Sequence, residues 1–133
     1  MIANVLLIFQ DDFKQRSFSD WLISHVSGSL PPHRYAGKVE ISGRSIRFYG
    51  TDTLINQNTD LIIRKESILE VFQGYDKVYN VFQTRGLGLT WAPVRLKFQD
   101  SDLGERYLYM LTGIEQDEIT NAYLYNFLVE WLS

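Results

Sequence analysis

The chain has 133 residues, of which 45% are hydrophobic and 22% charged, and it contains no cysteine. This composition predicts one folded domain and excludes a disordered chain, disulfides and thiolate metal sites. The net charge of −3 is uneven, with nine basic and six acidic residues in residues 36–98 but one basic and seven acidic in residues 99–133. Such a mild basic excess excludes a general nucleic-acid-binding surface.

Residues 1–35 are predicted to form an N-terminal extension that is helical. Apolar residues recur there at a spacing of four in two runs, Val5–Phe9–Phe13 and Phe18–Leu22–Val26. The competing interpretation is a strand at "NVLLIF", residues 4–9. The apolar start is far too short to span a bilayer and lacks the basic residues of a signal peptide, so we expect mature sequence.

From residue 36 the pattern changes to the period of two that is typical of strands. In "KVEISGRSIRFYG", apolar residues alternate with polar ones on both sides of Gly43 and Arg44, which are expected to form a two-residue type II′ turn. Further strands are predicted at residues 61–65, 68–73, 78–84, 94–98 and 106–112. Seven strands in a meander must protect their edges, so we expect a barrel or two packed sheets.

The end of the chain, residues 117–133, is predicted to be an amphipathic helix. Ile119, Tyr123, Phe127 and Trp131 recur at a spacing of four. The acidic residues near its start suit the helix dipole. So wide an apolar stripe should cover an open end or face of the strands.

Residues 36–133 resemble the pleckstrin-homology-like (PH-like) superfold, most closely its GRAM and bacterial PH-like branches. The matching stretches are "GKVEISGRSIRFYG" as a first hairpin, "LIIRKESILEVFQ", "WAPVRLKFQD" with "YLYML" as the last hairpin, and a closing helix with Trp131. The resemblance implies a mainly-β fold with α: a bent seven-stranded barrel plugged by the C-terminal helix and preceded here by the N-terminal helical extension. Members bind phosphoinositide headgroups, peptides or proteins, so the fold alone does not choose the function.

Five basic residues are candidate ligand-binding positions. Lipid-binding PH domains carry a lysine and an arginine pair on the first hairpin, and the resemblance implies Lys38, Arg44 and Arg47 for an anionic lipid headgroup. Two residues separate these arginines, whereas one separates them in the family pattern. Arg95 and Lys97 share a strand face and extend the candidate patch, unless they are the ordinary polar side of a half-buried strand.

No motif indicates catalysis, a metal site or a cofactor. His25 and His33 lack the spacing of metal ligands, and no serine stands in a nucleophile motif. The glycines of "GLGL", residues 86–89, precede no helix that would receive a phosphate. We therefore expect a protein that is not an enzyme, and a sharp bend at a barrel corner in this stretch.

Aromatic residues are candidate interface positions. Tyr107 and Tyr109 share one strand face and must be either exposed at an interface or covered by the N-terminal segment. Phe9, Phe13 and Trp21 must pack on the barrel or on a second copy of the chain.

The leading hypothesis is a cytoplasmic, non-enzymatic PH-like module that acts through protein–protein or self-association contacts. One alternative is binding of an anionic lipid headgroup, which would make the protein membrane-peripheral. The other is a small β-barrel that holds an apolar ligand inside, against which the count of seven strands argues.

Overall fold

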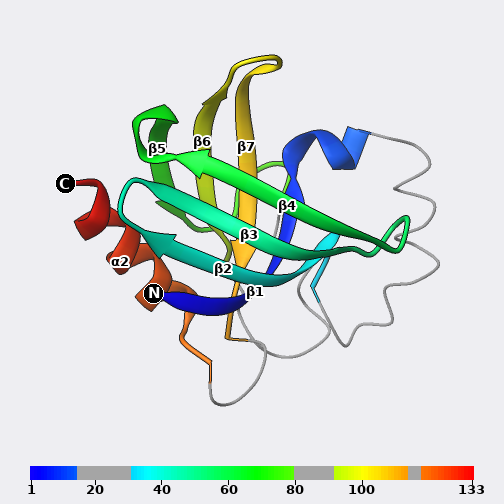
Figure 1. Ribbon diagram of the computed structural model, residues 1–133, viewed down its shortest axis with the longest axis horizontal. Coiled ribbons are helices and arrows are strands. Elements are labelled where there is room, and N and C mark those ends of the chain that lie inside the picture. Colours follow the sequence, from blue (N-terminus) through cyan, green and yellow to red (C-terminus); the bar gives the residue numbers. More distant parts are fainter. Residues whose placement is uncertain (15–30, 80–91, 114–117) are drawn as a thin grey trace.

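The computed structural model describes residues 1–14, 31–79, 92–113 and 118–133. Within them, seven antiparallel strands form one open sheet, ordered β4-β3-β2-β1-β7-β6-β5, and one α-helix follows the last strand (Figure 1). The elements are β1 (Ile2–Phe9), η1 (Gln10–Lys14), β2 (Tyr35–Ser42), β3 (Ser45–Asp52), β4 (Gln57–Arg64), η2 (Lys65–Ser67), β5 (Ile68–Gln73), β6 (Val94–Asp100), β7 (Gly104–Leu111) and α2 (Asn121–Leu132). The expected mainly-β fold with α is confirmed.

The N-terminal residues belong to the sheet, where β1 is the central strand between β2 and β7. The prediction of a helix is wrong for residues 2–9, and the competing strand is confirmed. A spacing of four is even, so Val5 and Phe9 share one face of a strand as readily as one face of a helix. Ile8, on the opposite face, is also buried, which removes the alternation that marks a half-buried strand.

Two expected segments, the run from Phe18 to Val26 and most of the strand at residues 78–84, lie outside the described residues. The seven strands therefore include β1, which the sequence did not favour. The two-residue turn is confirmed, because Ser42 pairs with Ser45 and Gly43 has a φ of 56°. β4 begins at Gln57, earlier than the predicted residue 61.

Gly37 of β2 lies directly opposite Gly50 of β3, where the two backbones approach closely. A Cβ on Gly50 would stand 2.7 Å from the Cα of Gly37 and against the carbonyl oxygen of Ala36. Two glycines thus allow the backbones to approach more closely than side chains permit.

We expect Gly50→Ala to lower the free energy of unfolding by about 2 kcal/mol, because two strands must move apart. A urea titration measures this loss. Gly43→Ala is the control: its Cβ meets no atom within 4 Å, and only the positive φ opposes it, which costs about 1 kcal/mol. An equal or smaller loss for Gly50→Ala would contradict the close approach.

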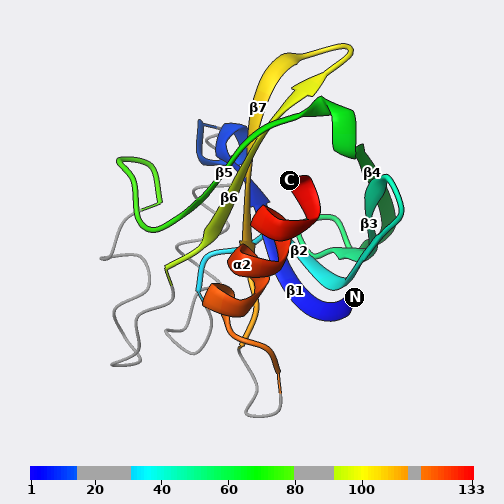
Figure 2. The ribbon, with the colours of Figure 1, turned by 90° about the vertical axis from the view of Figure 1, so that its left-hand side faces the viewer.

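The sheet curves into two walls with α2 between them (Figure 2). β2, β3 and β4 form one wall, β5, β6 and β7 form the other, and β1 joins them. Leu124 and Leu128 of α2 are fully buried among inward side chains of both walls. The helix starts after Thr120, whose side chain accepts the Tyr123 N–H at 3.0 Å. It is therefore shorter at its start than the predicted residues 117–133.

The edge strands are β4 and β5, which follow one another in the chain through η2 but are not paired with each other among the described strands. α2 packs against β5 and β6. The unpaired edge of β5 and the end of α2 therefore face the same opening (Figure 2).

Candidate functional site

The five candidate basic residues lie on two different walls and do not converge. Lys38, Arg44 and Arg47 belong to β2, β3 and the turn between them, whereas Arg95 and Lys97 belong to β6. The strand β1 pairs with the other side of β2, so "GKVEISGRSIRFYG" is preceded in the chain by a strand of the same sheet.

Most of these cations already face a carboxylate. Arg47 lies 2.7 Å from Asp60, and this ion pair raises the pKa of Arg47. Arg44 is only loosely associated, with 4.0 Å between its guanidinium and Glu66. Lys97 lies 3.4 Å from Glu105. Arg44 is thus the most available of the arginines among the candidates.

Arg95 is held on the outer face of its wall by four neighbours. Its guanidinium donates to Asp76 at 3.0 Å and to Glu70 at 2.9 Å. It also stacks between the rings of Phe72, at 4.7 Å, and Tyr107, at 5.1 Å. This geometry favours the interpretation of Arg95 as part of the ordinary polar side of a half-buried strand. A guanidinium paired with two carboxylates has little charge left for an anionic ligand.

The aromatic candidates that the structure describes pack within the chain. Phe9 is 6% exposed in the main core. Phe13 of η1 packs edge-on against Tyr79 and Tyr109, with ring centroids 6.0 and 6.3 Å apart. Tyr109 is fully buried in this second cluster, and Tyr107 is half-buried. Trp21 lies outside the described residues. Packing within one chain thus accounts for the burial of the rings that the structure describes.

Asp76 pins the segment after β5 onto the outer face of β6 and β7. Its carboxylate accepts the N–H groups of Val78 and Tyr79, the Tyr109 hydroxyl at 2.7 Å and the Arg95 guanidinium. Burial pushes the pKa of Asp76 up, but these hydrogen bonds outweigh burial and leave the pKa below its ordinary value of 3.8. Burial and the hydrogen bond to Asp76 raise the pKa of Tyr109.

We expect Asp76→Asn to lower the free energy of unfolding by about 2 kcal/mol at neutral pH, since hydrogen bonds to a charged group are lost. A lowered pKa means that the carboxylate stabilises the fold fully above its unfolded pKa and ceases to do so as pH falls through the folded pKa. The difference from wild type should therefore shrink below about pH 4. Urea titrations at several pH values measure it. A constant difference down to pH 2, or an equal effect of Asp102→Asn at the β6–β7 tip, would refute the assignment.

Arg34 joins two buried carboxylates at the start of β2. Its guanidinium donates to Asp12 at 2.7 Å and to Asp52 at 2.9 Å, and both carboxylates are 4% exposed. Hydrogen bonds to Asp52 hold the pKa of Arg34 above its usual value, although burial lowers it. The carboxylates also accept the N–H groups of Phe9 and Leu54. Arg34 thus fixes η1 and the β3–β4 turn, and its charge is matched by these two carboxylates.

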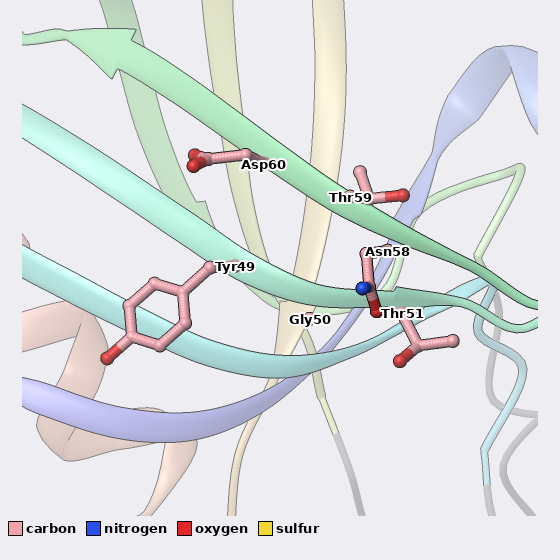
Figure 3. Close-up of a pocket in the computed structure, with 6 residues that line it drawn as sticks. All are labelled: Tyr49, Gly50, Thr51, Asn58, Thr59 and Asp60. Atoms are coloured by element: carbon pink, nitrogen blue, oxygen red, sulfur yellow. The ribbon is translucent and has the colours of Figure 1, made fainter.

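A shallow hollow of about 420 Å³ lies on the outer face of β3 and β4 (Figure 3). Its six lining residues are spread along the two strands, and the side chains of Tyr49 and Asp60 extend in different directions. Asp60 is already paired with Arg47. The hollow therefore lacks a set of polar groups that converge on one ligand.

A larger groove of about 590 Å³ lies at the mouth between the two walls. We call it the β5–α2 groove, and its lining residues are Arg44, Lys65, Glu66, Ile68, Leu69, Glu70, Val71, Val129, Leu132 and Ser133. Leu69 is 52% exposed and Val129 is 42% exposed, although each is a large apolar residue. Apolar side chains left open in a concave surface at a sheet edge favour a binding role.

The backbone of β5 also has hydrogen-bonding groups on the edge that pairs with no other described strand. Gly74 N–H donates to Pro93 O at 3.1 Å. Because hydrogen-bonded pairs alternate in an antiparallel ladder, Glu70 and Phe72 turn their backbone groups toward β6. Val71 and Gln73 therefore direct theirs to the open edge. Leu69 has no partner on β6 and forms a bulge.

Sequence reasoning missed Leu69, Val129 and Lys65. A signal existed for the first two, since Leu69 interrupts the alternation of "ILEVFQ" and Val129 lies off the apolar stripe of the helix. Their placement side by side depends on how α2 docks against β5, which no local pattern encodes.

Among the described residues, no group of three or more acidic or histidine side chains lies close enough to hold a metal ion. Within the part of the chain that the structure describes, no helix is long and apolar enough to cross a membrane. Comparison of the chain with protein-family models, curated proteins and solved structures finds no match.

Proposed function

We propose that the protein is a non-enzymatic interaction module with PH-like architecture, which binds an extended segment of a partner protein in the β5–α2 groove. The PH-like part is supported by an antiparallel meander bent into two walls and by a C-terminal helix inserted between them. The resemblance implies this arrangement of a bent barrel plugged by its last helix. The binding part rests on the groove itself.

One observation carries the proposal: the outer edge of β5, which no other described strand pairs with, borders an exposed apolar groove. Val71 and Gln73 offer backbone groups to an added strand, and Leu69 and Val129 offer apolar contacts beside them. In strand addition, the main-chain hydrogen bonds supply affinity and alternate side chains in pockets supply specificity. Both components are present at the edge of the six-residue strand β5, where Val129 of α2 adds to its apolar side.

The other functions considered have less support from the geometry. The cations expected to bind an anionic lipid headgroup are divided between two walls, and Arg47 and Arg95 are paired with carboxylates. An apolar ligand inside the barrel would have to displace Leu124 and Leu128, which fill the space between the walls. Self-association through Phe9 or Phe13 would require these rings to leave their contacts within the chain.

A peptide-display selection tests the proposal. A random nine-residue library is selected against the wild-type protein, and each selected peptide is then measured on two variants. Val129→Glu places a charge in the groove, whereas Ile55→Glu places the same charge at an equally apolar position, 53% exposed, in the β3–β4 turn.

Selected peptides should bind Ile55→Glu as they bind wild type and bind Val129→Glu about tenfold more weakly or worse, because an unpaired carboxylate would be buried by the ligand. Circular dichroism confirms that both variants are folded. Equal binding to Val129→Glu and wild type would overturn the proposal.

A further inference from the structure

The β5–α2 groove is apolar along its middle and positively charged at one end. Two cations, Arg44 and Lys65, line it together with the start of β5. The side chain of Arg44 is 80% exposed, and its guanidinium lies 4.0 Å from Glu66, beyond hydrogen-bond distance. An exposed pair at that distance contributes little and can exchange partners.

Lys65 is the second available charge. Its ammonium lies 5.3 Å from the ring centre of Trp131, and it forms no ion pair with any other residue that the structure describes. The other acidic side chain in the lining, Glu70, is engaged by Arg95 at 2.9 Å. Among the described side chains that line the η2 end of the groove, two are cations and one is a loosely held carboxylate.

The side chain of Trp131 contacts both segments that carry these two cations. Its indole Nε1 donates to the carbonyl oxygen of Gly43 at 3.2 Å, next to Arg44 in the turn. The same ring supports the Lys65 ammonium through its π face. One residue of α2 thus joins the β2–β3 turn and η2 at the charged end of the groove.

The geometry of β5 determines where on a bound segment this charge would act. A strand added in the antiparallel sense pairs more stably than a parallel one and runs from Gln73 toward Ile68. Its residue opposite Val71 then points to the inner side, as Val71 does, toward α2. The residue two positions later in the segment points to the same side. It lies beyond Val71, toward the bulge at Leu69 and the Arg44 and Lys65 end of the groove.

Resting on the proposed function, we propose that the β5–α2 groove selects an extended segment in which an apolar residue is followed, two positions later, by an aspartate or glutamate. The apolar side chain packs between Val71 and Val129. The acidic side chain lies between Arg44 and Lys65 and takes the place of Glu66 beside Arg44. The partner is thus a protein with an exposed strand-forming stretch of the pattern apolar–any–acidic.

Parallel selections and defined peptides test this inference. The random nine-residue library is selected on wild type and on the double variant Arg44→Gln/Lys65→Gln, with Arg47→Gln as the control for loss of an exposed cation outside the groove. From a peptide selected on wild type, three synthetic forms are made that carry Glu, Gln or Lys two residues after the apolar anchor.

On wild type, the Glu form should bind about two- to fivefold more tightly than the Gln form, and the Lys form should bind least. The advantage of the Glu form over the Gln form should shrink when salt is raised from 50 to 500 mM, because salt screens the attraction between the glutamate and the two cations. Both the acidic preference and the salt dependence should vanish on Arg44→Gln/Lys65→Gln and persist on Arg47→Gln.

The two proposals fail in different ways. Equal binding of the Glu and Gln forms to wild type, or an acidic preference that survives Arg44→Gln/Lys65→Gln, overturns the charge selection while the Val129→Glu result still supports the groove. A selection that yields no peptide, or peptides indifferent to Val129→Glu, overturns the groove and the charge selection with it.

Discussion

Arg34→Met is expected to lower the free energy of unfolding by about 3 kcal/mol, because it leaves two buried carboxylates without their counter-charge. Asp12 and Asp52 are each 4% exposed, and Arg34 is the residue that separates and neutralises them. Methionine keeps the apolar stem of the side chain, so the loss of stability reports the removal of the guanidinium charge. A urea titration followed by tryptophan fluorescence measures it.

Arg47→Met is the matched control. The Arg47–Asp60 pair has the same N–O distance as the Arg34–Asp12 pair, 2.7 Å, but its side chains are 54% and 50% exposed. Water and salt screen an exposed pair, so its loss should leave the unfolding midpoint almost unchanged. If both variants lost the same stability, burial would not be what makes Arg34 important.

Leu128→Ala is expected to lower the free energy of unfolding by about 3 kcal/mol, since a large cavity opens where α2 meets both walls. Leu128 is fully buried, and Leu124 one turn earlier fills the neighbouring space. The residue next to it, Val129, is 42% exposed in the groove. Val129→Ala should therefore cost well under about 1 kcal/mol.

This pair of adjacent substitutions tests how α2 is inserted. Thermal unfolding followed by circular dichroism should show a clear drop in midpoint for Leu128→Ala and almost none for Val129→Ala. A reversed order would mean that the helix presents its other side to the core, and the groove would then not exist in the form described.

Much of the fold could be predicted where local chemistry decides it. The β2–β3 turn needs a residue with positive φ, and Gly43 supplies it, so the hairpin was visible in the sequence. β5 was predicted with its observed bounds, and the C-terminal helix was visible from its apolar stripe. In each case one short stretch contains all of the relevant residues.

The rest depended on contacts between distant residues. β1 lies in the middle of the sheet and is buried on both faces at its end, so its apolar run matched a helix as well as a strand. Arg34 lies far in sequence from both carboxylates that it binds, Asp12 and Asp52. No spacing rule brings such a set together.

The candidate site was the hardest part to predict for the same reason. Its members come from the β2–β3 turn, η2, the edge strand β5 and the end of α2. In the sequence, Leu69 and Val129 look like ordinary apolar residues. The expected basic residues were visible as charges, but only their partners, such as Asp60 for Arg47, show which of them are engaged. Arg44 alone among them lines the groove.

Backbone hydrogen exchange tests strand addition at β5 most directly. In the free protein, the amides of Glu70 and Phe72 should exchange slowly because they face β6, and those of Val71 and Gln73 should exchange fast. Addition of a selected peptide at saturation should slow Val71 and Gln73 specifically. Unchanged exchange at these two amides, or new protection along the β4 edge instead, would contradict the account.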